Sequence, residues 1–201
     1  MSAIDRIREE RIVAILRRVD DVDARVAAAV AAGVRVVEIT LDSPGAPEAI
    51  ARARERGDAT VLAGTVRRPE QVDEAVAAGA EAVVGPAFAP LVLERARALG
   101  VPAIPGALTP TEIDAAWRAG AAMVKLFPGS LGGPRYVRDV LAPLAGVQLL
   151  VTGGVTADNA ADFLAAGAVA VGVGSALEDP EEARRLVAAV RKCASLVHYV
   201  N

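Results

Sequence analysis

The sequence predicts a single-domain α/β protein with the architecture of a (β/α)8 TIM barrel, and three observations carry this prediction. Helical segments alternate with short β-branched runs eight times along 201 residues. The runs lack an apolar–polar alternation, which is typical of strands buried on both faces of a parallel sheet. An Ala-rich stretch, an Ala-Gly pair and an apolar run recur as one frame, with glycines at Gly33, Gly79, Gly120 and Gly167. Strict alternation without a linker favours a closed barrel over the alternative, an open doubly wound sheet.

Each predicted strand is an apolar run, and several follow a glycine suited to the left-handed cap of a helix. In chain order the predicted strands are residues 11–17, 34–41, 60–65, 81–85, 101–105, 121–127, 148–152 and 168–174. The helices expected between them lie near residues 22–32, 45–56, 69–78, 90–99, 110–119, 134–143, 157–166 and 180–194. A short N-terminal helix at about 2–10 and a C-terminal helix and tail at about 180–201 complete the domain.

Helix starts are marked in the sequence as well. Thr109 followed by Glu112 reads as a capping box. Prolines that suit the first turn of a helix stand at Pro69, Pro90, Pro110 and Pro180.

Composition excludes several classes of partner. The net charge is −3 without a basic block, so nucleic acid and anionic membranes are not expected partners. Cys193 is the one cysteine, which excludes a disulfide framework and favours a reducing compartment. The N-terminus lacks an apolar signal region, and no stretch has the length of a membrane span. We therefore expect a cytoplasmic protein.

Lys125 is the most informative residue of the chain. Of 22 basic residues only Lys125 and Lys192 are lysine, and Lys125 lies within the apolar run AAMVKLFP. In a barrel, active sites lie at the C-terminal ends of the strands, which is where Lys125 falls. Burial at the barrel mouth disfavours the charged ammonium and would supply the neutral amine that attacks a ketone to form a Schiff base. The alternative is a lysine that reaches the rim or pairs with a carboxylate.

Glu38, in the run VVEIT, is a second ionisable group in a buried strand. One acid and one amine at strand ends suggest that both converge on one pocket, where Glu38 would act as a general acid/base. A buried ion pair without a catalytic role is the alternative.

Two glycine-rich turns follow the last two predicted strands. TGG places Thr152, Gly153 and Gly154 after the seventh, and GVGS places Gly174 and Ser175 after the eighth. Barrels often build a phosphate site from these two loops, and glycine lets the backbone approach the phosphate closely. Ordinary turn glycines are the alternative.

Other chemistries find no residues to carry them out. His198 is the sole histidine, so neither a soft-metal cluster nor a Ser-His-Asp set can be assembled. GVGSAL lacks the third glycine of a dinucleotide fingerprint. The sequence thus points to lysine chemistry without a metal or cofactor.

Several segments together resemble a known family. They are VEIT at 37–40, AGTV at 63–66, IPGALTPTE at 104–112, VKLFPG at 124–129, TGG at 152–154 and GVGSAL at 172–177. They follow the same order as in the 2-keto-3-deoxy-6-phosphogluconate (KDPG) aldolase / 4-hydroxy-2-oxoglutarate aldolase family, and the resemblance spans about residues 10 to 192.

The resemblance implies a metal-independent class I aldolase, a homotrimeric (β/α)8 barrel acting on keto acids and phosphosugars. It implies that Lys125 forms the Schiff base and that Glu38 moves protons. By the same resemblance Thr65, Pro86 and Phe127 are expected to wall the pocket around the pyruvyl part of the substrate, and Thr152 is expected near the substrate carboxylate. The phosphate cradle would consist of Gly153, Gly154, Gly174 and Ser175.

One stretch departs from some family members. Where they have an arginine after the Glu-containing strand, which binds the substrate carboxylate, this chain has TLDS with Asp42. Other members carry an arginine at the end of the first strand, which predicts this role for Arg17. Arg18 is the rival, because neighbouring strand residues face opposite ways.

Two other functions are consistent with the residues alone: a phosphosugar isomerase or epimerase using Glu38 without a covalent step, and a catalytically silent oligomeric scaffold. The sequence leaves open the C4 configuration and the phosphorylation state of the preferred substrate, and the role of the tail 194–201.

Overall fold

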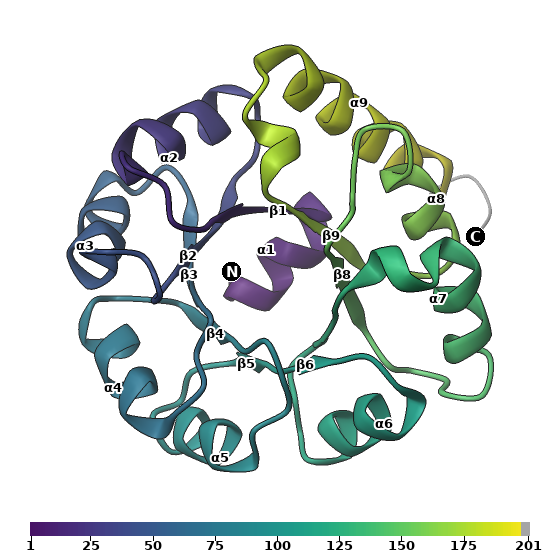
Figure 1. Ribbon diagram of the computed structural model, residues 1–201, viewed down its shortest axis with the longest axis horizontal. Helices are drawn as coiled ribbons and strands as arrows, with labels where there is room; N and C mark the ends of the chain where they lie inside the picture. Colours follow the sequence, from purple (N-terminus) through teal and green to yellow (C-terminus); the bar gives the residue numbers. More distant parts are fainter. Residues whose placement is uncertain (198–201) are drawn as a thin grey trace.

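The computed structural model describes the backbone of residues 1–197 and the side chains of residues 1–193. Within these residues a single sheet of parallel strands runs in the order β5-β4-β3-β2-β1-β9-β8-β7-β6. Its strands are β1 (Ile12–Leu16), β2 (Val36–Thr40), β3 (Thr60–Gly64), β4 (Ala82–Val84), β5 (Ala103–Ile104), β6 (Gly106–Ala107), β7 (Val124–Leu126), β8 (Leu149–Thr152) and β9 (Ala170–Val173). Figure 1 shows these strands as a ring surrounded by helices. The predicted barrel is confirmed.

All eight predicted strands are present, and the fifth differs from the prediction in extent. It continues beyond 105 and is divided at Pro105 into β5, which pairs with β4, and β6, which pairs with β7. The Pro105 carbonyl accepts from the Lys125 N–H at 2.8 Å, so hydrogen bonding to β7 extends through the proline. The continuous segment 103–107 thereby joins the two edges of the sheet and closes the barrel.

The helices follow the predicted alternation. They are α1 (Ala3–Glu10), α2 (Val22–Ala31), α3 (Ala46–Arg56), α4 (Pro69–Ala77), α5 (Pro90–Ala98), α6 (Pro110–Arg118), α7 (Gly133–Leu141), α8 (Ala160–Ala165) and α9 (Pro180–Val197), with the 3-10 turns η1 (Gly129–Leu131) and η2 (Ser175–Leu177). The capping box of Thr109 and Glu112 is formed. The four glycines of the repeated frame have positive φ, between 90° and 108°, as expected for left-handed helix ends. The seventh predicted segment, 157–166, is helical only over α8, and the eighth, α9, extends past 194 to Val197.

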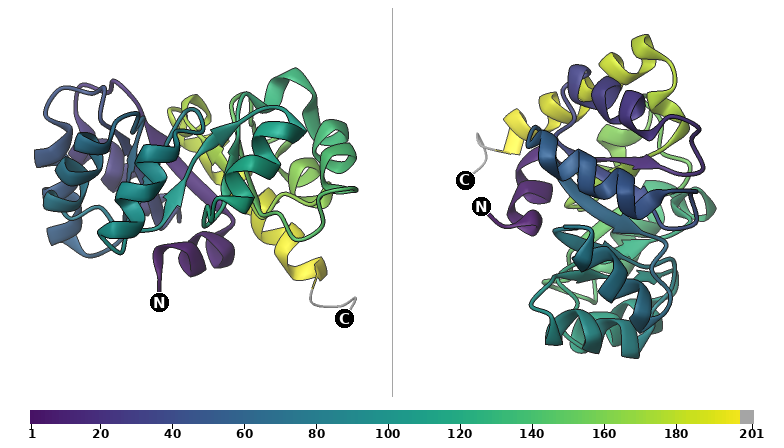
Figure 2. Two further views of the ribbon diagram at one scale, coloured as in Figure 1. Left: turned by 90° about the horizontal axis from the view of Figure 1, so that it is seen from below. Right: turned by 90° about the vertical axis from the view of Figure 1, so that its left-hand side faces the viewer.

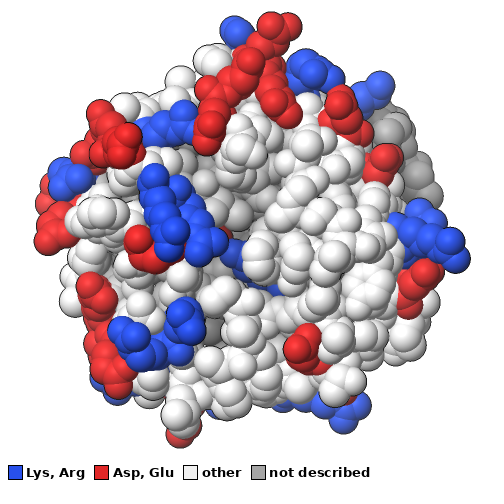
Figure 3. All heavy atoms as spheres, viewed as in Figure 1, with Lys and Arg blue, Asp and Glu red and all other residues white. Residues whose placement is uncertain are grey.

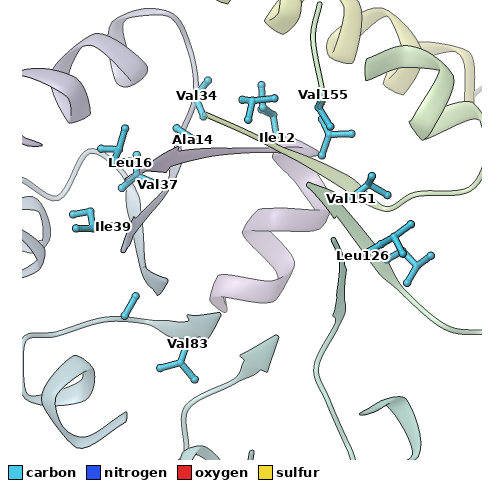
Figure 4. Packing of buried hydrophobic residues seen from close by; sticks show 14 of the residues in the cluster. Ile12, Ala14, Leu16, Val34, Val37, Ile39, Val83, Leu126, Val151 and Val155 are labelled. Carbon is cyan, nitrogen blue, oxygen red and sulfur yellow. The ribbon is translucent and has the colours of Figure 1, made fainter. Parts of the chain in front are cut away.

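Alternation along the strands divides the buried residues into two layers. Ile12, Ala14 and Leu16 of β1 belong to the larger hydrophobic cluster, together with residues of the outer helices. In Figure 4 the labelled side chains of this cluster, Ile39 and Leu126 among them, point away from the barrel axis. The intervening residues of each strand therefore face the barrel interior.

The interior is apolar at its N-terminal end. Val13, Val36, Leu62, Met123 and others form a second buried cluster, and this cluster includes Ala3, Ile4 and Ile7 of α1. Figure 2 shows α1 lying across one end of the barrel. Since α1 closes that end, the interior can be reached by a substrate only at the opposite end, where the strands terminate.

None of the helices in the described residues combines the length and apolar character needed to cross a membrane.

Candidate active site

A cavity of about 350 Å³ opens at the C-terminal ends of the strands. Figure 3 shows this face hollowed near its centre, with basic side chains gathered on the side of α3 and α4. Every residue that the sequence analysis placed in the site lines this cavity: Arg17, Glu38, Thr65, Pro86, Lys125, Phe127, Thr152, Gly153, Gly154, Gly174 and Ser175.

Lys125 and Glu38 meet across the barrel. They belong to β7 and β2, which are not neighbours in the sheet, and both face inward. The Lys125 Nζ donates to Glu38 Oε1 at 3.3 Å. Lys125 is 9% exposed and Glu38 is fully buried, so the amine does not reach the rim. Among the described residues the second oxygen, Glu38 Oε2, has no hydrogen-bond partner, which leaves one carboxylate oxygen to act on a bound molecule.

Gly64, at the end of β3, determines where the Glu38 carboxylate lies. A Cβ atom placed on Gly64 would lie 2.3 Å from Glu38 Oε1 and 2.7 Å from its Cγ, well inside contact distance. The side chain of Glu38 therefore passes directly over this glycine. Sequence reasoning did not assign Gly64 a role, although it falls inside the motif AGTV.

The aromatic ring of Phe127 lies close to the Lys125 amine. The Lys125 Nζ lies 5.9 Å from the centre of the ring, within the range of a cation–π contact. Phe127 is 39% exposed and lines the same cavity as the amine.

Arg17, rather than Arg18, faces the cavity. Arg17 follows Val13 and Ile15 in the inward alternation of β1, whereas Arg18 has a positive φ of 51° and a side chain that is 71% exposed. The Arg17 Nε and Nη2 donate to Asp42 Oδ2 at 3.1 and 3.0 Å, and the Arg18 Nε lies 3.3 Å from the same oxygen. Asp42 thus holds Arg17 in place, and the group of two arginines and one aspartate keeps a net positive charge.

The charge of Asp42 is stabilised by these neighbours. Burial acts to raise the pKa of Asp42, but the Thr40 hydroxyl and the Arg17 guanidinium, together with the charge of Arg18, bring that pKa below its ordinary value. Asp42 is therefore ionised at neutral pH and remains paired with Arg17.

The two glycine-rich turns line the cavity where β8 and β9 end. Gly153 and Gly154 have φ of 84° and 80°, a conformation that favours glycine. A Cβ at Gly153 would lie 3.1 Å from the Phe127 ring, and one at Gly154 would lie 2.6 Å from the Cβ of Ser130. Gly174 and Ser175 begin η2 after β9. The backbone approaches the cavity here because side chains are absent.

Four threonines line the cavity, and two of them, Thr152 and Thr40, are buried within the barrel. The Oγ1 of Thr152 is buried without a hydrogen-bond partner among the described residues, and it lies next to Gly172, where a Cβ would be 2.7 Å from Thr152 Cγ2. The Thr40 hydroxyl, in contrast, lies 3.3 Å from the Leu16 carbonyl and 3.1 Å from the Ser43 hydroxyl. The Thr152 hydroxyl is therefore available to bind a ligand.

The sequence analysis missed two charged residues of the cavity, Arg25 and Glu178. Arg25 belongs to α2 and Glu178 follows η2, so neither lies at the end of a predicted strand. An arginine interrupting the Ala-rich stretch 22–32 was the only available signal. In the described residues no group of three or more His, Cys, Asp or Glu side chains could hold a metal ion.

Comparison with known proteins places the chain among aldolases. The sequence profile of the KDPG and KHG aldolase family matches residues 3–192. The chain is 39% identical over 171 residues to 2-dehydro-3-deoxy-6-phosphogalactonate aldolase of Escherichia coli, covering 83% of each chain. It is 38% identical over 166 residues to 2-dehydro-3-deoxy-phosphogluconate aldolase of Treponema pallidum, covering 82% of this chain and 79% of the other.

Solved structures agree with the sequence matches. The structure named "Native KDPGal structure" superposes with a TM-score of 0.85 at 34% identity, over 92% of this chain and 96% of the other. The family match, the sequence identities and the shared barrel lead to one conclusion. The chain belongs to the KDPG and KHG aldolase family of metal-independent class I lyases.

Proposed function

We propose that this enzyme reversibly cleaves 2-keto-3-deoxy-6-phosphogluconate to pyruvate and glyceraldehyde 3-phosphate through a Schiff base on Lys125. One observation carries the proposal above all others. The Lys125 amine is buried in the cavity beside the Glu38 carboxylate, at 3.3 Å. An amine and a proton-transferring carboxylate in contact are what imine chemistry on a ketone requires.

The covalent step begins at the C2 ketone. The lone pair of the Lys125 Nζ attacks C2 to give a carbinolamine, which loses water to form a protonated imine. Glu38 Oε1, which accepts from Nζ, is placed to take the proton that the amine must lose. Glu38 then returns this proton to the carbinolamine hydroxyl, which leaves as water, so Glu38 is again a carboxylate when the imine has formed.

Carbon–carbon cleavage follows from the imine. Glu38 removes the proton from the C4 hydroxyl, directly or through one water, and its partnerless Oε2 is the oxygen suited to this. The C3–C4 electron pair moves into the imine and leaves an enamine, while C4 departs as the aldehyde of glyceraldehyde 3-phosphate. Proton return to C3 and hydrolysis of the imine then release pyruvate and the free lysine.

Binding residues hold the two ends of the substrate. Arg17 has donors left after its bonds to Asp42, and a guanidinium suits the substrate carboxylate. Thr65, Pro86, Phe127 and Thr152 would enclose the pyruvyl part. The backbone of Gly153, Gly154, Gly174 and Ser175 would cradle the phosphate.

Substrate range is a finer part of the proposal. Cleavage of 4-hydroxy-2-oxoglutarate to pyruvate and glyoxylate uses the same imine and needs no phosphate site. Relatives carry names for both gluconate- and galactonate-derived substrates. An assay across these keto acids decides the preference, including the C4 configuration.

Borohydride trapping with pyruvate tests the mechanism. Reduction of the imine should attach the pyruvate carbons to Lys125 irreversibly, and peptide mass spectrometry would locate the modification. Lys125→Arg should abolish both trapping and cleavage. Modification found only on Lys192 would refute the role of Lys125, and cleavage surviving in Lys125→Arg would favour the isomerase alternative.

We further propose that the enzyme is a cytoplasmic homotrimer. Its single cysteine supports a reducing compartment. Phe127 and Leu131 expose apolar surface directly after β7, at 39% and 70%, which supports a contact between subunits on this side.

A further inference from the structure

Each of the three basic side chains that line the cavity forms an ion pair with a carboxylate, and the three pairs differ in length and exposure. Lys125 is paired with buried Glu38 and Arg17 with Asp42. Arg25 is paired with Glu178, with 3.8 Å between Arg25 Nη2 and Glu178 Oε1. This ion pair is the longest of the three, and the Glu178 side chain is 66% exposed, against 29% for Arg25. A long, exposed ion pair contributes little stability and is easily exchanged.

The pair lies beside the glycine-rich turns. Glu178 follows η2, and its N–H donates to the Ser175 carbonyl at 2.9 Å. Arg25 extends from the second turn of α2, which Figure 1 shows beside the segment leading from β9 to α9. Both residues line the same cavity as Gly174 and Ser175. Through its pairing with Glu178, Arg25 is a cation linked to the segment that begins with Gly174 and Ser175.

A positive charge at this end would strengthen the binding of a phosphate. A phosphate monoester carries between one and two negative charges at neutral pH. Gly153, Gly154, Gly174 and Ser175 are all neutral, so they supply hydrogen bonds but no counter-charge. Charge-assisted bonds from a guanidinium to a phosphate are about twice as strong as neutral ones.

We infer that Arg25 recognises the substrate phosphate and that Glu178 is its exchangeable partner, released when the phosphate binds. The pair thereby sets the preference for phosphorylated over unphosphorylated keto acids. This inference rests on the proposed function. It adds a pair of residues that selects the substrate, and this pair is separate from Lys125 and from the strand ends.

Selectivity is the first measurement. It compares kcat/KM for 2-keto-3-deoxy-6-phosphogluconate with that for 4-hydroxy-2-oxoglutarate. Arg25→Gln should lower this ratio about tenfold or more, as expected for the loss of a charged hydrogen bond, mainly through KM of the phosphorylated substrate. Glu178→Gln should raise the ratio, because it removes the competing charge. Arg25→Lys should recover part of the ratio, since it keeps the charge but not the planar fork.

A matched control is available in Arg95→Gln. Arg95 also joins two elements through an exposed ion pair, with Asp73, but lies outside the cavity. This variant changes the net charge equally and should leave the ratio unaltered. Equal loss on both substrates in Arg25→Gln would mean a merely structural role and would overturn the inference. An unchanged ratio of kcat/KM values in both Arg25→Gln and Glu178→Gln would also overturn the inference. If Arg25→Gln does not fold, the ratios measured for Arg25→Lys and Glu178→Gln decide.

Binding of inorganic phosphate separates this inference from the proposed function. Phosphate should raise the Tm of the wild type and of Arg95→Gln, the rise being smaller in Arg25→Gln and larger in Glu178→Gln. If pyruvate is not trapped yet this pattern appears, the aldolase assignment fails and the phosphate site stands. If pyruvate is trapped on Lys125 but phosphate stabilises Arg25→Gln as much as the wild type, the inference fails alone.

Discussion

At the residue scale, the positions of the Glu38 and Arg17 side chains depend on single neighbouring residues. Glu38 reaches Lys125 because a glycine on the adjacent strand leaves space for its carboxylate. Arg17 keeps its orientation because Asp42 accepts two of its N–H groups. Gly64 and Asp42 would not touch the reacting atoms. Their substitution should therefore change activity only by moving Glu38 or Arg17.

Gly64→Ala should displace the Glu38 carboxylate. Since the new Cβ would lie 2.3 Å from Oε1, Glu38 must move, and kcat should fall about tenfold or more, the scale of general acid–base contributions. Steady-state kinetics would measure this, with pyruvate trapping as a second readout. Glu38→Asp gives the control, because the shorter side chain relieves the contact. In the double variant the effects should be non-additive, and strict additivity would contradict the role of Gly64.

Asp42→Asn should release Arg17 and raise KM for keto acids. Its effect on stability depends on pH in a defined direction. Because the folded-state pKa of Asp42 is lowered, the ionised group stabilises the fold above its unfolded value of about 3.9, and this contribution is lost as pH falls through the folded pKa. Urea unfolding of the wild type and Asp42→Asn should differ at pH 7 and converge in acid. A difference that grows as the pH is lowered would contradict the assigned pairing.

At the element scale, α1 serves as the closed end of the barrel. It contributes Ala3, Ile4 and Ile7 to the interior cluster, while its other face bears exposed ion pairs such as that of Arg6 with Glu9. The helix starts at Ser2, whose hydroxyl accepts from the Asp5 N–H. A cap at one end of the interior lets the polar groups gather at the other.

Ile7→Ala tests this arrangement. Ile7 is fully buried, so the variant should lose about 2–5 kcal/mol of unfolding free energy, as for other Ile-to-Ala cavities. Chemical denaturation would measure the loss, and the folded protein should keep its rate of pyruvate trapping. Glu9→Ala, on the exposed face, is the control and should change stability by about 0.5 kcal/mol or less. Equal stability of the two variants would show that α1 does not close the barrel.

At the scale of the whole molecule, the question is how copies of the barrel assemble. Leu131 in η1 and Leu91 on α5 are the most exposed large apolar side chains after Met1 among the described residues. Of these two leucines, only Leu131 is close in the sequence to another exposed large apolar residue, Phe127. For the proposed trimer we therefore expect the subunit contact at the surface that includes Phe127 and Leu131.

Leu131→Asp should weaken the proposed trimer. A charge in an apolar contact is costly unless it is paired, so sedimentation equilibrium should show a shift towards monomers as the protein is diluted. Leu91→Asp introduces the same charge at an equally exposed leucine and should leave the mass unchanged. If both variants remain trimers, the contact lies elsewhere.

The sequence alone was sufficient for the barrel, since its signals are local. Caps, first-turn prolines and unbroken apolar runs report on a few neighbouring residues each, and eight such units have one closed arrangement. Local signals also placed the end of the fifth strand too early, at Pro105. Pro105 lacks an N–H, but its carbonyl accepts from the Lys125 N–H, so the pairing continues beyond it. Local signals likewise identified Lys125 and Glu38, as charges inside runs that otherwise avoid them.

Only the tertiary structure could decide what depends on distances between separate elements. It determined that Arg17 faces the cavity and Arg18 does not, that Gly64 makes room for Glu38, and that Arg25 reaches the site from a helix. The physical reason is that side-chain direction and contact are fixed by the closure of the barrel, in which β2 and β7 face each other across its interior although 87 positions separate Glu38 from Lys125.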